Sequence, residues 1–583
     1  MAKSEVGIVA FNRGIVSPLA LAREDLKRIL LSAEEQTNWM PRVLGSMMLR
    51  AGLEYLGTSA LNAPAKYLDF IYANDDTALV EIGEESIRIW IEDELLTRPA
   101  VTAAVTNGEF TSDISGWTDS DEVGGASTWH PSGYLQLVGN GSAAARLRQE
   151  VTVNEPDTEH GLRIVVRRGP AVLKVGSTDG GEEYIEEVIL ATGEHSLSFT
   201  PAGNFHIELS SRRIPAVLVE EVTVEAAGVV ELPSPWLEDE LSLLRHIQSA
   251  DVIFIACNGV VQHRIERRGD RPNARGWSIV EYLTEDGPFR PANLGPTTLT
   301  PSAISGDITL TASAPIFKAN HVGALWQITQ TGQRVEKTYT AQNQFSDSIR
   351  VTGTGESRRF TISIEATGAT ATLTLQRSIE EEGNWEDLSS PGPFNLATSS
   401  TTYNDTLDNQ IVYYRIGVKT GDYTSGTGSA ALSYTLGSTT GVVRVTGYST
   451  ATSVTAQVLV ALGGVVATDE WAEGAWSVVR GFPSAVTLHE GRLIWAGKDK
   501  VWGSVSDAFD SFDPDTEGDS GPLSRSIGSG PVDSISWLLS LARLLMGAEG
   551  AEFSVRSSAF DEPLTPTNFA VKRMSTLGSA KVP

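Results

Sequence analysis

The chain has 583 residues, 41% of them hydrophobic, and its 45 Lys and Arg against 73 Asp and Glu give a formal net charge of -28. This length predicts several domains, and the acidic excess disfavours proteins that grip nucleic acid phosphates or anionic membrane surfaces. A single cysteine, Cys257, excludes an intramolecular disulfide, and no apolar run approaches the roughly 20 residues that a membrane-spanning helix needs.

Residues 1–100 predict a short N-terminal helix followed by a β-meander. Ser17 can cap the helix and Pro18 suits its first turn. The expected apolar face consists of Leu19, Ala22, Leu26, Ile29 and Leu30. Three short strands separated by polar turns are then expected at 67–72, 78–82 and 86–91.

Residues 101–228 predict an inserted jelly-roll domain. Short alternating strands recur there at nearly regular spacing, with Gly and Asn at the turns. The phrase NGEFTSDISGW (Asn107–Trp117) and the strand RQEVTV (Arg148–Val153) resemble galactose-binding-like folds found in many carbohydrate-binding modules. Trp117 is expected in the core of this sandwich, because large aromatic side chains are mostly buried.

The remaining sequence predicts three more blocks. A β-rich platform segment is expected at 229–335, and an inserted immunoglobulin-like sandwich, held by packing without cysteines, at 336–440. Residues 441–583 predict a propeller-like platform segment, because two stretches, around 474–505 and from Ile535, repeat the same strand, turn and strand pattern. The fold class is therefore mainly β and multidomain.

Four phrases in order along the chain are similar to the tail nozzle proteins of short-tailed bacteriophages, also called tail tubular protein B. The N-terminal phrase comprises Phe11–Arg28 (FNRGIVSPLALAREDLKR) and Asn38–Gly57, where Arg50-Ala51-Gly52 lacks the usual proline. The others are Gln248–Phe289, the segment HVGALWQI from His321, and Arg480–Phe512, which begins RGFPSAVTLHEGRLIWAG. The phrases cover about half of the chain, and the segments between them are interpreted as inserted domains.

The resemblance implies a structural virion protein and not an enzyme. Such a protein forms a ring, expected to be a hexamer, that extends the tail tube, docks to the head-tail adaptor and carries a tail fibre or tailspike protein. It would be made in the host cytoplasm, reside in the virion tail and conduct genomic DNA during ejection without specific binding. Acidic residues along the channel, with candidates in Glu81–Leu95 and Asp513–Asp519, would let DNA slide. The family normally continues beyond a segment such as 441–583, so the chain is expected either to be a shortened member or to lack a further part after residue 583.

Candidate subunit-interface residues lie in the platform segment. They are Arg480, Arg492, Trp476 and Trp495, because Arg and Trp dominate the binding energy of many protein interfaces. The alternative for both tryptophans is ordinary core packing.

Two further candidate sites concern ligands. Trp129 and Tyr134 of the jelly roll are glycan-contact candidates, since aromatic rings stack on sugars. Asp513, Asp515, Glu517 and Asp519 recur at alternate positions with Gly518 in the sixth place, which predicts a possible calcium loop. Ser524 stands where such a loop has a bidentate Glu, so a solvated acidic loop is the alternative, and no other cofactor is expected.

Two rival functions remain open. The chain could be a polysaccharide-binding adhesin of a phage or cell surface, with the jelly roll as its binding domain, or a depolymerase of surface polymers. The eight histidines have no partner at metal-binding spacing, and no phosphate-binding loop is present. The sequence therefore offers no catalytic residues.

Overall fold

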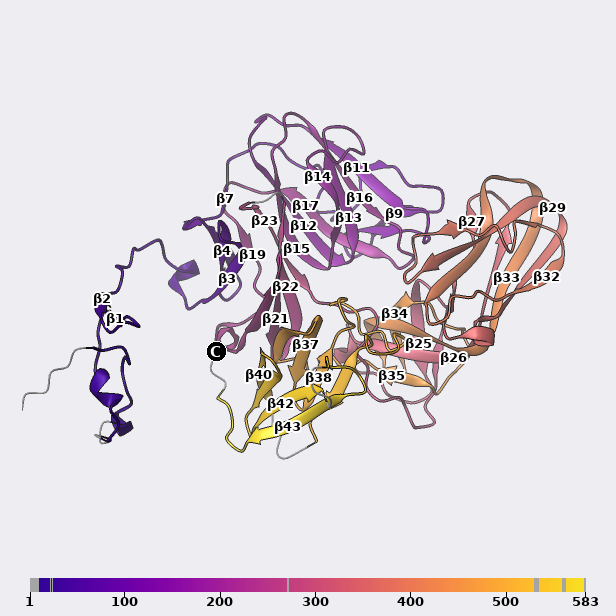
Figure 1. Cartoon of the computed structure of the whole chain (residues 1–583). Helices are drawn as coiled ribbons and strands as arrows, with labels where there is room; N and C mark the ends of the chain where they lie inside the picture. The colour runs from indigo at the N-terminus through magenta and orange to yellow at the C-terminus, as the bar shows by residue number, and fades with distance from the viewer. Residues whose placement is uncertain are drawn as a thin grey trace, which may run out of the picture. The chain divides into compact units, whose positions relative to one another are not determined.

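The computed structural model describes residues 10–20, 23, 25–269, 272–528, 534–557 and 562–580. The chain divides into two compact units, Met1–Thr58 and Ser59–Pro583. Strands dominate the architecture, which confirms the mainly β, multidomain fold class (Figure 1). In the described part of the chain, no helix is long and apolar enough to cross a membrane.

The N-terminal unit contains a hairpin of β1 (Trp39–Pro41) and β2 (Met47–Leu49) and two single-turn 3-10 helices, η1 (Pro18–Ala20) and η2 (Ile29–Leu31). The continuous helix expected from Ser17 to Leu30 is not formed by its described residues, and Ala22 lies outside them. Backbone bonds three residues apart, such as Ala20 N to Ser17 O at 2.8 Å, replace the α-helical ladder. An isolated short helix is marginal in water without an apolar face to pack on, and Leu19 is 92% exposed.

Four antiparallel sheets in the second unit form a propeller-like stack (Figure 1). In the last three, the strands follow one another in chain order, and in the first a strand from later in the chain is added. The four sheets are β3 (Lys66–Ala73), β4 (Asp76–Ile82), β5 (Ile87–Ile91), β6 (Glu94–Leu95) and β19 (Glu231–Leu232); β20 (Arg245–Ser249), β21 (Val252–Cys257), β22 (Val260–Arg268) and β23 (Gly276–Glu281); β36 (Ala485–His489), β37 (Arg492–Gly497), β38 (Lys500–Gly503) and β39 (Leu523–Ser526); and β40 (Ile535–Ser540), β41 (Leu544–Ala548), β42 (Glu552–Ser557) and β43 (Phe569–Ser575).

The first strands of these sheets lie beside one another. The Gln248 side chain of β20 donates to Ile71 O of β3 at 2.9 Å and accepts from Ile71 N at 3.0 Å. Strand β36 contacts both β20 and β40. Neighbouring first strands are typical of propeller blades. The third and fourth sheets, which contain the two repeated stretches of the sequence, are therefore arranged in the same way as the first and second sheets.

Three apolar cores fill the spaces between successive sheets. Side chains of β21 alternate between two of them: Ile253 and Ile255 pack toward the first sheet, whereas Phe254 and Ala256 pack toward the third. The same alternation occurs in β37, where Trp495 enters one core and Ile494 the next. Because successive strand residues point to opposite faces, uninterrupted apolar runs are what a sheet buried on both faces requires.

A β-sandwich occupies the chain between the first and second of these sheets. One of its sheets contains β9 (Ala126–His130), β10 (Tyr134–Val138), β17 (Val217–Val224), β12 (His160–Arg168) and β15 (Gly193–Phe199). The other contains β8 (Thr118–Asp119), β11 (Ala145–Val151), β16 (Phe205–Ser211), β13 (Ala171–Gly176) and β14 (Ile185–Leu190). Trp117 lies in the core between them, as expected. Strand β15 also pairs with β23, so the sandwich sheet continues into the propeller-like stack.

Two further cores share unusually long strands. Strands β26 (Leu325–Tyr339) and β33 (Val412–Thr450) run through both, and their pairing shifts register between Thr331 and Gln333. On one side of this shift they join β24 (Leu299–Pro301), β25 (Asp307–Ala312), β34 (Ser453–Val460) and β35 (Trp471–Glu473). On the other they join β27 (Gln344–Phe345), β28 (Ile349–Val351) and β29 (Phe360–Ile379), with β30 (Glu386–Asp387), β31 (Phe394–Asn395) and β32 (Ser399–Tyr403) on β29.

Candidate functional site

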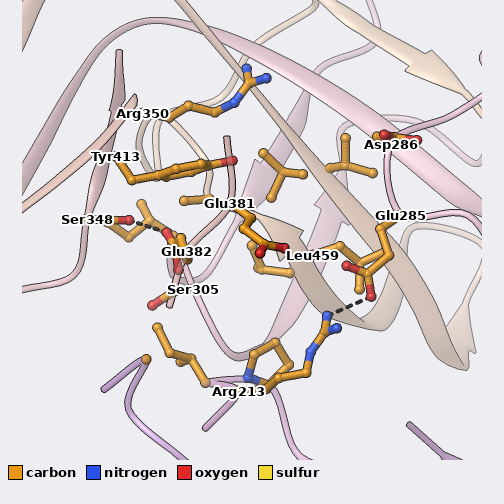
Figure 2. Close-up of a pocket in the computed structure, with 18 of the residues that line it drawn as sticks. Arg213, Glu285, Asp286, Ser305, Ser348, Arg350, Glu381, Glu382, Tyr413 and Leu459 are labelled. Carbon is orange, nitrogen blue, oxygen red and sulfur yellow. Dashed lines mark hydrogen bonds and ion pairs between the residues drawn. The ribbon is translucent and has the colours of Figure 1, made fainter. Parts of the chain in front are cut away.

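A cavity of about 360 Å³ lies where five parts of the second unit meet (Figure 2). Its walls come from the sandwich loop 212–215, the loop 285–286, the segments 304–306 and 458–461 of the neighbouring sheet, the segments 347–350 and 380–383, and the loop 513–515. Most of its polar lining is charged: Arg212, Arg213, Glu285, Asp286, Asp347, Arg350, Glu380, Glu381, Glu382, Asp513 and Asp515. We call this the junction cavity.

Arg350 of β28 is the central cation of the junction cavity. Only 5% of its side chain is exposed, and its guanidinium pairs with Asp513 at 3.2 Å and with Asp515. Burial alone would lower its pKa, but Tyr413 and the two carboxylates outweigh burial and raise it above the usual value. Gln333, at the register shift of β26, accepts from Arg350 N at 2.9 Å and so fixes the backbone that carries it.

The predicted calcium loop takes a different form. Arg350 places its guanidinium on Asp513 and Asp515, where a cation would have to bind. Within the described ranges, no group of three or more His, Cys, Asp or Glu side chains could hold a metal ion, so Glu517 and Asp519 do not complete a site. Asp513 and Asp515, two of the four predicted ligands, therefore serve an arginine from another module, and the geometry of the described residues does not support the calcium interpretation.

A second set of polar contacts joins the loops across the junction cavity. Arg213 pairs with Glu285 at 2.8 Å, as Figure 2 shows. Asp286 accepts from Phe512 N at 2.8 Å and from Ser511 Oγ at 2.5 Å. Burial raises the pKa of Asp286 to about 6, although both hydrogen bonds act in the opposite direction. These contacts link the sandwich, the loop 285–286 and the blade loop 511–515.

Beside the junction cavity, one tryptophan connects the loop between β29 and β30 to the sandwich. Trp385 Nε1 donates to Gly141 O at 3.1 Å. The Arg415 guanidinium lies 4.0 Å from the centre of the Trp385 ring, a cation–π contact. Together with the ion pairs, this contact makes the cavity a meeting point whose charged groups hold modules in register. Within the cavity, the Ser348 hydroxyl donates a hydrogen bond to Glu382, and burial raises the pKa of that carboxyl group (Figure 2).

The four interface candidates lie close together but differ in exposure. Trp495 is 0% exposed and lies in the core between the second and third sheets of the stack, with the half-buried Trp476 packed against it. Arg492 is 2% exposed and donates to the carbonyls of Ser504 at 2.6 Å and Gly521 at 2.7 Å, among others. Arg480 is partly exposed and pairs with Glu473. Trp495 and Arg492 therefore pack within their own chain, which leaves Arg480 and Trp476 nearer the surface.

The glycan-contact candidates do not share a surface. In the β9–β10 hairpin, Trp129 lies opposite Leu135 and Tyr134 lies opposite His130, so the two rings project from opposite faces. Trp129 is 36% exposed and its Nε1 donates to Phe110 O at 2.8 Å. Tyr134 stacks on His130 with ring centres 5.9 Å apart. They form no single flat platform for a sugar.

One of the expected channel acids is also internal. Glu81 is 1% exposed and accepts from Arg88 at 2.6 Å and from Trp90 Nε1 at 2.8 Å. In contrast, Glu84, Glu85, Glu92, Asp93 and Glu94 of the same stretch are exposed.

Comparisons with known proteins identify no family. No protein-family model and no curated protein matches the chain. Among solved structures, the N-terminal CBM22-1-CBM22-2 tandem domain from Paenibacillus barcinonensis Xyn10C shares 12% identity over 64% of this chain and 98% of that chain, with a TM-score of 0.16. An IolB-like protein from Salmonella typhimurium LT2 shares 7% identity over 57% of this chain and 92% of that chain, with a TM-score of 0.11. Hazelnut (Corylus avellana) vicilin shares 8% identity over 57% of this chain and 87% of that chain, with a TM-score of 0.11. Such low TM-scores give no support to a shared fold or function.

Replacing Arg492 with Ala is expected to destabilise the protein by at least about 3 kcal/mol, because several buried carbonyl groups lose a charged donor. Chemical denaturation followed by tryptophan fluorescence measures the loss. Arg492→Lys keeps the charge without the guanidinium fork and should lie in between. The exposed Arg543 in the β40–β41 turn provides the matched control, and equal effects of Arg492→Ala and Arg543→Ala would contradict the structural role.

Asp286 is expected to make the stability depend on pH. Its pKa of about 6 in the folded protein lies above its value in the unfolded chain. Its contribution to the free energy of unfolding is therefore complete below about pH 4 and disappears as the pH rises through 6. Asp286→Asn should remove this decrease in the free energy of unfolding, which amounts to at most about 3 kcal/mol. Thermal unfolding of both proteins between pH 4 and 7 gives the comparison, with the exposed Asp499→Asn as control. Parallel pH curves for Asp286→Asn and the unchanged protein would disprove it.

Proposed function

We propose that the chain is a structural subunit of the tail of a short-tailed bacteriophage, a ring-forming nozzle that conducts DNA during ejection. The proposal starts from the sequence resemblance, and one structural observation carries it further. Two of the resembling phrases, Gln248–Phe289 and Arg480–Phe512, are far apart in the sequence, yet they build adjacent sheets. Phe254 and Tyr282 of the first phrase share a core with Trp495 and Phe512 of the second.

This common core supports the interpretation of the phrases as one platform. Tyr282 and Trp495 lie with ring centres 4.9 Å apart, and the Tyr282 hydroxyl donates to Phe509 O at 2.5 Å. The intervening modules join the platform through strand pairing and buried ion pairs, so a load on one module passes to the next. A rigid, multiply connected body suits a wall of a tube.

The charge of the chain also suits a wall around moving DNA. A protein that neutralises phosphates with Lys and Arg releases counterions and grips DNA, whereas a net charge of -28 opposes such binding. In this proposal the subunit docks to a head-tail adaptor and to a fibre or tailspike, and DNA passes without being held. The junction cavity contributes rigidity and no catalysis.

Electron microscopy of purified virions labelled with an antibody to this chain tests the proposal. We expect label at the free end of the tail, and we expect the purified chain to form rings with a central opening, visible in negative stain and as a discrete oligomer in sedimentation velocity. Virions without label at the tail, together with a purified chain that stays monomeric, would contradict it.

A binding assay separates the nozzle from the adhesin. The nozzle proposal predicts that the purified chain shows no affinity for host surface polysaccharide beyond that of its Trp129→Ala variant. Trp129→Phe, which keeps an aromatic ring, is the matched control. Polysaccharide binding that Trp129→Ala abolishes and Trp129→Phe retains would favour the adhesin instead.

A further inference from the structure

The N-terminal unit exposes apolar side chains without a core of its own. Among the described residues of 10–58, no hydrophobic side chain is buried. The exposed large apolar residues of this unit are Ile15, Leu19, Leu26, Leu30, Trp39, Met40, Val43, Leu44, Met48, Leu49, Leu53, Tyr55 and Leu56. Single exposed apolar residues are ordinary, but a segment of this length with many exposed apolar side chains and none buried is expected to pack on another surface.

The tip of the β1–β2 hairpin concentrates this exposure. Val43 is 92% and Leu44 98% exposed, and Arg42 precedes them. The turn is closed by Arg42 N to Ser46 O at 2.8 Å and Gly45 N to Arg42 O at 2.9 Å. Gly45 has a φ of 97°, which other residues rarely adopt, so the turn keeps its shape and presents two adjacent apolar side chains.

An apolar groove in the second unit has a complementary character. Its volume is about 310 Å³, and its walls include Tyr282, Leu283, Pro288, Val322, Trp476 and Val478. Val322 and Val478, at 46% and 61%, are exposed beside the aromatic walls. Glu281 and Arg444 also line the groove. The charge of Arg444 acts on the Glu281 carboxylate, so the groove carries one charge of each sign and suits a ligand whose contacts are mainly apolar side chains.

The charge distribution favours the same pairing. Residues 1–58 carry seven Lys and Arg and six Asp and Glu, a net charge of +1, so Ser59–Pro583 carries a net charge of -29. Two copies of the second unit therefore repel each other, whereas the near-neutral N-terminal unit can approach either of them. A ring in turn requires two different surfaces on each subunit that fit each other head to tail.

We propose that the hairpin tip Arg42–Ser46 of one copy inserts into the apolar groove of a second copy. Val43 and Leu44 cover Trp476 and Val478. The tip and the groove are the two unlike surfaces that a closed ring needs. This inference rests on the proposed ring-forming function and adds the contact that closes the ring.

Cysteine cross-linking tests this contact in the full-length chain. Cys257, the single native cysteine, is 1% exposed, and burial raises the pKa of its thiol to about 12, so it reacts slowly. One preparation carries Leu44→Cys and the other, made larger by a tag, carries Val478→Cys. Both positions are exposed, so folding should be unaffected. On mixing and mild oxidation, we expect a mixed cross-linked product, since only different copies can supply the two thiols.

The control pair combines Leu44→Cys with Leu294→Cys, because Leu294 is 100% exposed but outside the groove. The Val478→Cys pair should yield about tenfold more mixed product, reflecting the high effective concentration of groups in a bound complex. Equal yields for the two pairs would overturn the proposal. So would a chain carrying both Leu44→Cys and Val478→Cys that cross-links within itself while the mixture gives no product, because the tip would then occupy its own groove.

A charge placed at the tip provides a second measurement. Leu44→Asp should abolish the oligomer in sedimentation velocity, whereas Leu294→Asp should leave it unchanged. Rings that persist with Leu44→Asp would overturn the tip contact and leave the nozzle function standing. If the protein without substitutions forms no rings and virions carry no label at the tail, both the tip contact and the nozzle function are refuted.

Discussion

The two-sided burial of the middle sheets is the constraint on which the propeller-like stack depends. Strands β21 and β37 send alternate side chains into different cores, so each strand joins the sheet before it to the sheet after it. A polar residue in the middle of such a strand would face an apolar core whichever way it pointed. The stack is therefore specified by short uninterrupted apolar runs, and shifting one strand by a residue would exchange the contents of two cores.

Buried arginines add specific contacts both between the modules and between sheets of the stack. Arg98 pairs with Glu159 at 2.7 Å and Glu225 at 2.8 Å, and Arg350 pairs with Asp513 and Asp515. Arg267 pairs with Asp251 at 2.8 Å and with Asp76. Arginine suits these positions because its planar fork satisfies two acceptors in a fixed geometry. Breaking such a pair leaves an uncompensated buried charge, so the pairs specify how modules meet even where their net stabilisation is small.

Local patterns in the sequence predicted much of the fold. The alternating strands and the repeated strand pattern from 474 onward follow from periodicity, which is a local property. The core position of Trp117 follows from its size, because large aromatic side chains are mostly buried. The predicted N-terminal helix is wrong, because a helix of that length depends on the packing of its apolar face, and the Leu19 side chain is exposed. The apolar core that residues 299–328 share with 443–462 could not be recognised either, since its strands come from two distant segments.

The junction cavity lay beyond sequence reasoning for a related reason. Asp513 is 163 positions from Arg350, and no spacing rule connects them. The alternation of acids from Asp513 to Asp519 was visible, but the same pattern can serve calcium, solvent or a guanidinium, and only the fold decides among them. Arg492 illustrates the same limit, because an arginine next to apolar residues resembles an interface residue until its acceptors, the carbonyls of a later loop, are placed beside it.

The distribution of charge connects the internal and external behaviour of the molecule. Several carboxylates of the second unit are buried and neutralised by arginines, as Glu81, Glu225 and Asp513 are. The excess of acids over bases is therefore expressed mainly at its surface, where it opposes the approach of other acidic surfaces. Assembly of such bodies cannot rely on general attraction and needs local apolar contacts whose burial outweighs the repulsion. The N-terminal unit meets this requirement, because its net charge is near zero and it exposes apolar side chains.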